Sequence, residues 1–123
     1  MFIAVFRRRL KPGKTYEDFE AAWVAEQGFG VPAHVFSAVR LDDEREVLTV
    51  GFVDVAADDL ASLSSSVQTA EAQRESRIDE VIESTELRAM YELKSEHDFS
   101  DVPKDVILGS SASMLAPLVA REA

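Results

Sequence analysis

Five side chains of the sequence could form a binding site for an aromatic or polyketide-like small molecule. Histidine titrates near neutral pH, so His34 could transfer a proton to or from a bound phenol or enol. Trp23, Phe36, Phe52 and Tyr91 could supply apolar walls, with the Tyr91 hydroxyl donating a hydrogen bond to a carbonyl or phenolate oxygen. We therefore predict a catalytic role for His34, a pocket lined by the four aromatic residues, and no metal site.

Three of these residues also have a purely structural interpretation, and the sequence leaves both open. Trp23 is also explained as the core anchor of an amphipathic helix, and Tyr91 as an ordinary core residue of a strand. A single histidine at the start of a strand, such as His34, is often a hydrogen-bonded surface residue. We expect Trp23 to face the sheet, with Phe36 and Phe52, or Tyr91, across from it and His34 near the mouth of the cavity.

The segment "GFGVPAH" of residues 28–34 fits the pattern of a dinucleotide-binding loop, but its surroundings exclude that function. Such a loop follows a strand and opens a helix, so that amide groups point at the pyrophosphate. Here a predicted helix precedes the glycines and a predicted strand follows them. Gly28 fits the residue that caps the end of a helix, and Pro32 prevents further helix. We expect no nucleotide, flavin or other cofactor.

Composition and charge exclude several other classes of protein. The 123 residues suffice for one domain, and the formal net charge of -10 repels nucleic acid and anionic membrane surfaces. The chain has no cysteine, which rules out disulfides and thiolate chemistry. Its apolar start precedes the arginines at 7–9, the reverse of a signal peptide, and no apolar run could span a membrane. We predict a soluble cytoplasmic protein with no nucleic-acid or membrane partner.

The hydrophobic pattern predicts elements in the order β-α-β-β-α-β. Strands are expected over residues 2–10, 34–41, 46–55 and 85–93, with helices from Thr15 to the Gly28 cap and over residues 58–82. This order predicts an α+β, ferredoxin-like fold with a four-stranded antiparallel sheet. We expect a domain over residues 1–99 and a less regular tail over 100–123, where Pro117 would interrupt a short apolar helix.

Several strands carry apolar residues on both of their faces. Ile3 and Val5 alternate with Phe2 and Phe6 in the first strand, for example. Two helices can cover only one face of a four-stranded sheet, and an exposed apolar face of several hundred Å² is rare in a monomer. We therefore predict a homodimer that forms through the sheet faces. The triplet Arg7-Arg8-Arg9 is expected to pair with carboxylates, because its members point to alternate faces.

Four segments carry a resemblance to the dimeric α/β-barrel superfamily, which includes antibiotic-biosynthesis monooxygenase-like and EthD-like proteins. They are "FIAVFRRRLKPG", "YEDFEAAW", "GFGVPAHVFSAV" and "VIESTELRAMYEL", and the resemblance extends from Phe2 to about Phe99. It implies a dimeric α/β barrel and a cofactor-independent monooxygenase or isomerase acting on an aromatic or polyketide-like molecule. The alternative is a non-catalytic ligand-binding or assembly module of the same fold. The chain has no asparagine, so it lacks the catalytic set of the haem-degrading branch.

Overall fold

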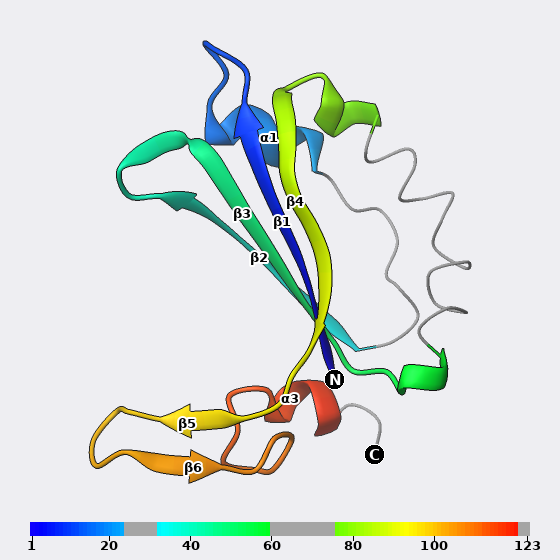
Figure 1. The fold of residues 1–123 in the computed structure, drawn as a ribbon, viewed down its shortest axis with the longest axis vertical. Coiled ribbons are helices and arrows are strands. Elements are labelled where there is room, and N and C mark those ends of the chain that lie inside the picture. The colour runs from blue at the N-terminus through cyan, green and yellow to red at the C-terminus, as the bar shows by residue number, and fades with distance from the viewer. Residues whose placement is uncertain (24–31, 60–75, 121–123) are drawn as a thin grey trace.

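The protein is built on a four-stranded antiparallel sheet (Figure 1). The computed structural model describes residues 1–23, 32–59 and 76–120. Its strands β1 (Phe2–Leu10), β2 (Ala33–Arg40), β3 (Asp43–Val53) and β4 (Ile82–Glu92) lie in the order β2-β3-β1-β4. All three neighbouring pairs are antiparallel. The predicted α+β class and four-stranded antiparallel sheet are confirmed, and the arrangement is compatible with a ferredoxin-like fold.

Helix α1 (Tyr16–Ala22) packs on one face of the sheet near the end of β1, and the opposite face carries exposed side chains such as Phe36 and Leu48. Leu10 of β1 and Val47 of β3 join Phe19 of α1 in the main hydrophobic cluster, which also includes Ile78, Val81 and Ile82. We call the side of Leu10 and Val47 the covered face. Residues of the opposite parity in each strand, Ile3 and Val5 among them, form the open face.

Helix α1 begins where the sequence predicts and ends earlier. Thr15 caps its first turn and forms a reciprocal capping box with Asp18, in which each side chain contacts the backbone N–H of the other residue. The turn before it places Gly13 at a φ of 84°, a backbone conformation that favours glycine. The helix ends at Ala22, with Trp23 as its C-cap. The predicted Gly28 cap lies outside the described residues.

The boundaries of the strands differ from the prediction at both turns of the sheet. The loop between β2 and β3 contains only Leu41 and Asp42, so β3 begins three residues earlier than predicted. Strand β4 begins at Ile82, in a segment predicted to be helical, because Val81 and Ile82 turn into the core beside Leu10. Of the predicted second helix, the turn of residues 76–79 is described, and a short 3₁₀ helix, η1 (Ala57–Asp59), precedes it.

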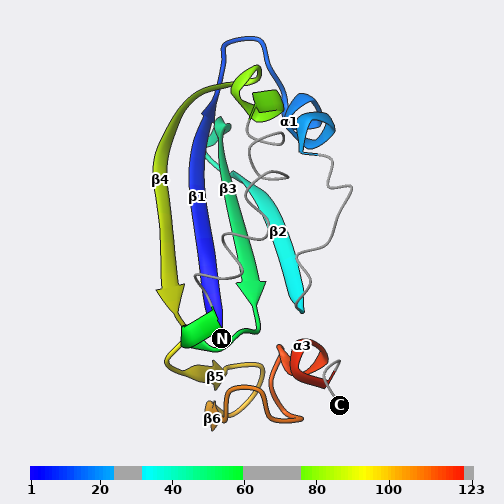
Figure 2. The same ribbon diagram turned by 90° about the vertical axis from the view of Figure 1, so that its right-hand side faces the viewer.

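The C-terminal segment is more regular than the sequence indicates. Strands β5 (Glu96–Asp98) and β6 (Lys104–Val106) form a small antiparallel sheet that crosses the predicted boundary at residue 99. Helix α3 (Ala116–Ala120) follows, and Pro117 lies in its first turn, where a missing N–H costs nothing. Figure 2 shows α3 and the β5–β6 hairpin at one end of the large sheet and α1 at the other.

Candidate functional site

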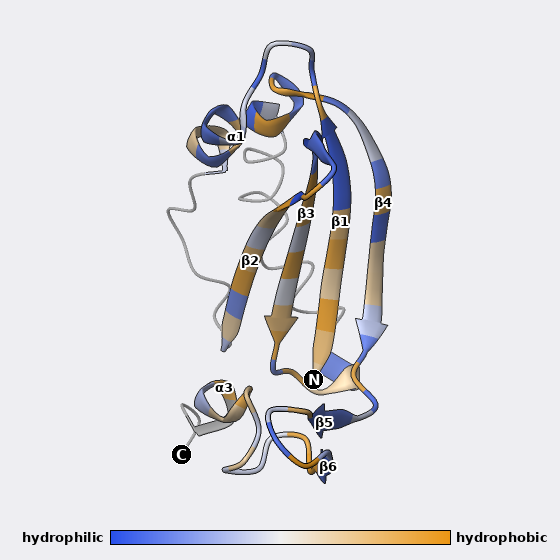
Figure 3. Cartoon of the chain, turned by 90° about the vertical axis from the view of Figure 1, so that its left-hand side faces the viewer, coloured by the Kyte–Doolittle hydropathy of each residue, from blue (hydrophilic) through white to orange (hydrophobic). Residues whose placement is uncertain are grey.

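The open face of the sheet carries three apolar rows that cross all four strands. Directly opposite residues of antiparallel strands point to the same side, so the register defines each row. The first row contains His34, Phe52, Ile3 and Tyr91, the second contains Phe36, Val50, Val5 and Ala89, and the third contains Ala38, Leu48, Arg7 and Leu87. Figure 3 shows apolar residues along the half of β1 that lies nearest the N-terminus.

Large apolar side chains of this face are exposed to solvent. The exposed fractions are 58% for Phe36, 49% for Tyr91 and 40% for Leu48. Phe36 of the second row and Phe52 of the first form an edge-to-face aromatic pair across β2 and β3, with ring centroids 6.0 Å apart. The open face is thus a preformed apolar surface with one histidine and one tyrosine hydroxyl at its two edges.

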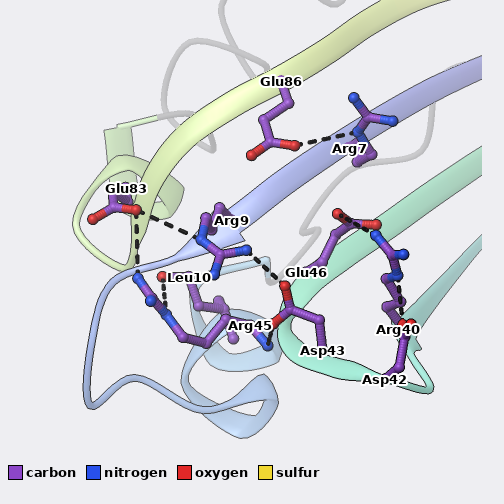
Figure 4. A network of polar contacts seen from close by, with 10 residues as sticks. All are labelled: Arg7, Arg9, Leu10, Arg40, Asp42, Asp43, Arg45, Glu46, Glu83 and Glu86. Atoms are coloured by element: carbon purple, nitrogen blue, oxygen red, sulfur yellow. Dashed lines mark hydrogen bonds and ion pairs between the residues drawn. The ribbon is translucent and has the colours of Figure 1, made fainter.

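A band of ion pairs borders this apolar surface at the end of the sheet that carries the β2–β3 turn (Figure 4). Arg9 contacts Asp43 at 2.8 Å and Glu83 at 3.8 Å, and Arg7 contacts Glu86 at 3.4 Å. The side-chain hydrogen bond from Arg9, together with one from the backbone N–H of Arg45, lowers the pKa of Asp43. Arg7 and Arg9 therefore pair with carboxylates as predicted. Within the band, the positive charges of the arginines are balanced by the negative charges of nearby carboxylates.

The rest of the band connects all four strands. Arg45 donates to the backbone oxygen of Leu10 at 3.1 Å and contacts Glu83 at 3.4 Å. Arg40 contacts Asp42 at 2.6 Å, and the hydrogen bond from Arg40 to Glu46 measures 3.5 Å. The members of this arginine–carboxylate band are Arg7, Arg9, Arg40, Arg45, Asp42, Asp43, Glu46, Glu83 and Glu86. An apolar centre with a polar border is the usual anatomy of a protein interface.

The covered face holds a second group of polar side chains that sequence reasoning did not single out as a site. Arg8 is buried, and its guanidinium lies 4.5 Å from the ring centroid of Phe6 and 6.0 Å from that of Phe19. The hydroxyls of Ser37 and Thr49 are 3.2 Å apart, and Thr49 is buried. The sequence signal for them is the period of two: Arg8, Ser37 and Thr49 each have an apolar residue two positions away, which lies on the same face of the strand.

The structure brings four of the five predicted site residues to one face and places the fifth on the other. His34, Phe36, Phe52 and Tyr91 all have the parity of the open face. Trp23 packs against the hydrophobic cluster on the covered face. The five residues therefore do not line a single cavity between the sheet and the helices. His34 and Tyr91 lie at opposite edges of the first row, three strands apart.

The second histidine, His97, lies in the C-terminal hairpin. Its Nδ1 is 2.8 Å from Asp105 Oδ1, its cross-strand partner in β6. Within residues 1–23, 32–59 and 76–120, no three histidine, aspartate or glutamate side chains are grouped to hold a metal ion. None of the helices in the same ranges has the length and apolar character needed to cross a bilayer.

The function of the protein is assigned from its fold and the chemistry of its surface, because comparison with known proteins gives no match. The chain matches no protein-family model, no curated protein and no solved structure with statistical significance. What defines its class is an α+β fold with a four-stranded antiparallel sheet, one face of which is covered and the other open.

Proposed function

We propose that this protein is a self-assembling module in which the open face of one copy packs against the same face of a second copy. The observation that carries this proposal is the set of three mostly apolar rows, in which the large side chains of Phe36, Leu48 and Tyr91 are exposed to solvent in a single protomer. Contiguous apolar surface of this extent on a monomer is typical of an interaction site. A second copy is the occupant that the surface fits best, because an apolar centre with a polar border is self-complementary under two-fold symmetry.

The size of the apolar rows sets the scale of the interface. With strands about 4.8 Å apart and rows about 6.8 Å apart, twelve positions cover about 400 Å² measured flat. A standard interface buries about 800 Å² of accessible surface on each partner. Side chains project from the sheet, so their accessible area is larger than this flat area. The sheet faces therefore supply a large part of a stable interface, and another element can add further contacts.

Sedimentation of the full chain over a series of concentrations tests the proposal. We expect a dimer at micromolar concentration and dissociation to a monomer on dilution, because association depends on concentration. The dimer should persist in high salt, since burial of apolar surface is not screened as ion pairs are. A protein that stays monomeric at every concentration would contradict the proposal.

A cofactor-independent monooxygenase or isomerase acting on an aromatic or polyketide-like molecule is the second candidate function. The observation that favours it is the hydrogen-bonded pair of hydroxyls of Ser37 and the buried Thr49, on the same face of the sheet as Trp23. These hydroxyls could donate a hydrogen bond to a phenol or enol held among apolar groups, or accept one from it. His34 lies on the other face, so it would act only on a ligand bound between two copies.

The fluorescence of Trp23 tests this second candidate, because the chain contains one tryptophan. A ligand on the covered face should change the emission of Trp23, and the near-isosteric Thr49→Val should weaken its binding by about tenfold through loss of a hydrogen bond. His34→Ala, on the opposite face, is the matched control and should bind normally. Equal binding by Thr49→Val and the unaltered protein would exclude this site, and binding without turnover would exclude the enzyme.

A further inference from the structure

We propose that residues 94–120, which we call the tail from here on, contact the second copy of the chain that packs on the open face. This inference rests on the proposed dimer and identifies a second element of its interface. It explains why an ordered segment at one end of the sheet presents large apolar side chains to solvent. Three observations carry it: the distribution of exposed apolar residues, the internal order of the tail, and the side of the sheet from which it projects.

Exposed apolar side chains concentrate on two surfaces of the described protein. Of the nine large apolar side chains that are exposed among the described residues, three belong to the rows of the open face and four to the tail, while Leu41 and Met90 lie elsewhere. The exposed fractions of the tail residues are 74% for Phe99, 76% for Val102, 80% for Ile107 and 87% for Met114. Apolar side chains gathered on one ordered segment indicate a contact surface, whereas single ones scattered over a protein need no explanation.

The tail holds a defined shape through its own contacts. The Glu96 carboxylate accepts hydrogen bonds from the Ser113 hydroxyl and from the backbone N–H of Met114, the latter at 3.0 Å, and thereby links β5 to the segment before α3. Ser113 and Leu118 are buried. The exposed side chains are therefore presented on a preorganised surface, which lowers the entropic cost of binding a partner.

The tail leaves the sheet next to the first apolar row. Strand β4 carries Tyr91 of that row, and Leu93 donates a backbone hydrogen bond of 3.1 Å to Met1, which fixes the start of the tail beside β1. In Figure 1 the β5–β6 hairpin extends to the left at the lower end of the sheet, whereas the turn of residues 76–79, whose Ile78 packs on the covered face, lies to the right of β4 at the upper end. The hairpin thus projects toward the open-face side, where a second copy would lie and where the sheet alone leaves room for further contact.

The test compares the full-length double variant Phe99→Ser/Ile107→Ser with the unaltered protein by sedimentation equilibrium. Both side chains are exposed in the protomer, so the variant should keep the far-UV circular dichroism of the parent. We expect its dimer dissociation constant to rise by at least about tenfold, because two apolar contacts at the interface are lost. Leu41→Ser is the matched control, since Leu41 is fully exposed at the β2–β3 turn, far from the tail, and its dimer should be unchanged.

A second measurement uses the absence of cysteine from the chain. In the variant Val102→Cys the single thiol should react with a maleimide more slowly as the protein concentration rises through the dissociation constant. A dimer with unaltered affinity in the double variant, or a thiol whose reactivity is independent of concentration, would overturn the role of the tail and leave the sheet-face dimer standing. An unaltered protein that is monomeric would overturn both.

Discussion

Phe36→Glu is expected to abolish self-association at concentrations at which the unaltered protein is dimeric. Phe36 lies in the second apolar row, and more than half of its surface is exposed in the protomer. In a two-fold interface the substitution would bury two carboxylates and remove two aromatic anchors. We expect the dissociation constant to rise by about a hundredfold or more, because hot-spot truncations cost about 2 kcal/mol and burial of an unpaired charge costs more. Sedimentation equilibrium measures this change directly.

Leu41→Glu provides the control for that prediction. It introduces the same charge at a fully exposed apolar residue, but at the β2–β3 turn and outside the three rows. Its dimer should have the affinity of the unaltered protein, and both variants should fold, since neither residue is buried in the protomer. Equal affinities for Phe36→Glu and Leu41→Glu would show that the open face is not the interface.

Phe19→Ala is expected to lower the free energy of unfolding by about 3–5 kcal/mol, the range for removal of a buried aromatic side chain. Phe19 is 1% exposed and joins α1 to Leu10 and Val47 of the sheet. Its removal leaves a cavity at the contact that positions the helix on the covered face. Urea denaturation, monitored by circular dichroism, measures the change when both proteins are compared at the same protein concentration, because the stability of an associating protein depends on concentration.

Leu41→Ala is the reference for this second experiment, because it removes an apolar side chain that has no buried surface to lose. Its free energy of unfolding should stay within about 0.5 kcal/mol of the parent value. If Phe19→Ala were as stable as Leu41→Ala, the cluster around Phe19 would not be the principal core of the protein.

Local signals in the sequence are sufficient to predict the elements of the sheet. The β-branched and aromatic residues of β1 and the turn at Pro12-Gly13 define the first strand, and Thr15 followed by Asp18 defines the start of α1. The observed boundaries of an element differ from the predicted ones where tertiary contacts determine them. Val81 and Ile82 fit a helical pattern, but the core beside Leu10 draws them into a turn and a strand. The β5–β6 hairpin was missed because its short strands carry charged residues and little alternation.

The grouping of the candidate site residues follows from strand register, which sequence alone does not supply. His34 and Phe36 share a face because they are two residues apart in β2, and Phe52 joins them through the pairing of β2 with β3. Tyr91 of β4 lies on the same face because it is paired with Ile3 of β1. The pairing of β1 with β4 contains two register shifts. A shift of one residue at either pairing would have moved a strand's side chains to the other face. The separation of Trp23 from the other four is set by which face α1 covers.

The central position of β1 has a consequence for how the chain acquires its structure. Although β1 is the first of the four strands to be synthesised, its pairing with β4 joins Phe2 to Glu92 and Leu10 to Ile82. Contacts between residues so distant in sequence form slowly, because the closure entropy of a long loop precedes any gain from pairing. Until the chain through Glu92 has been synthesised, β1 can pair with β3 on one side, but its other side remains an unpaired apolar edge. A nascent chain at this stage is a natural client for a chaperone that shields such edges.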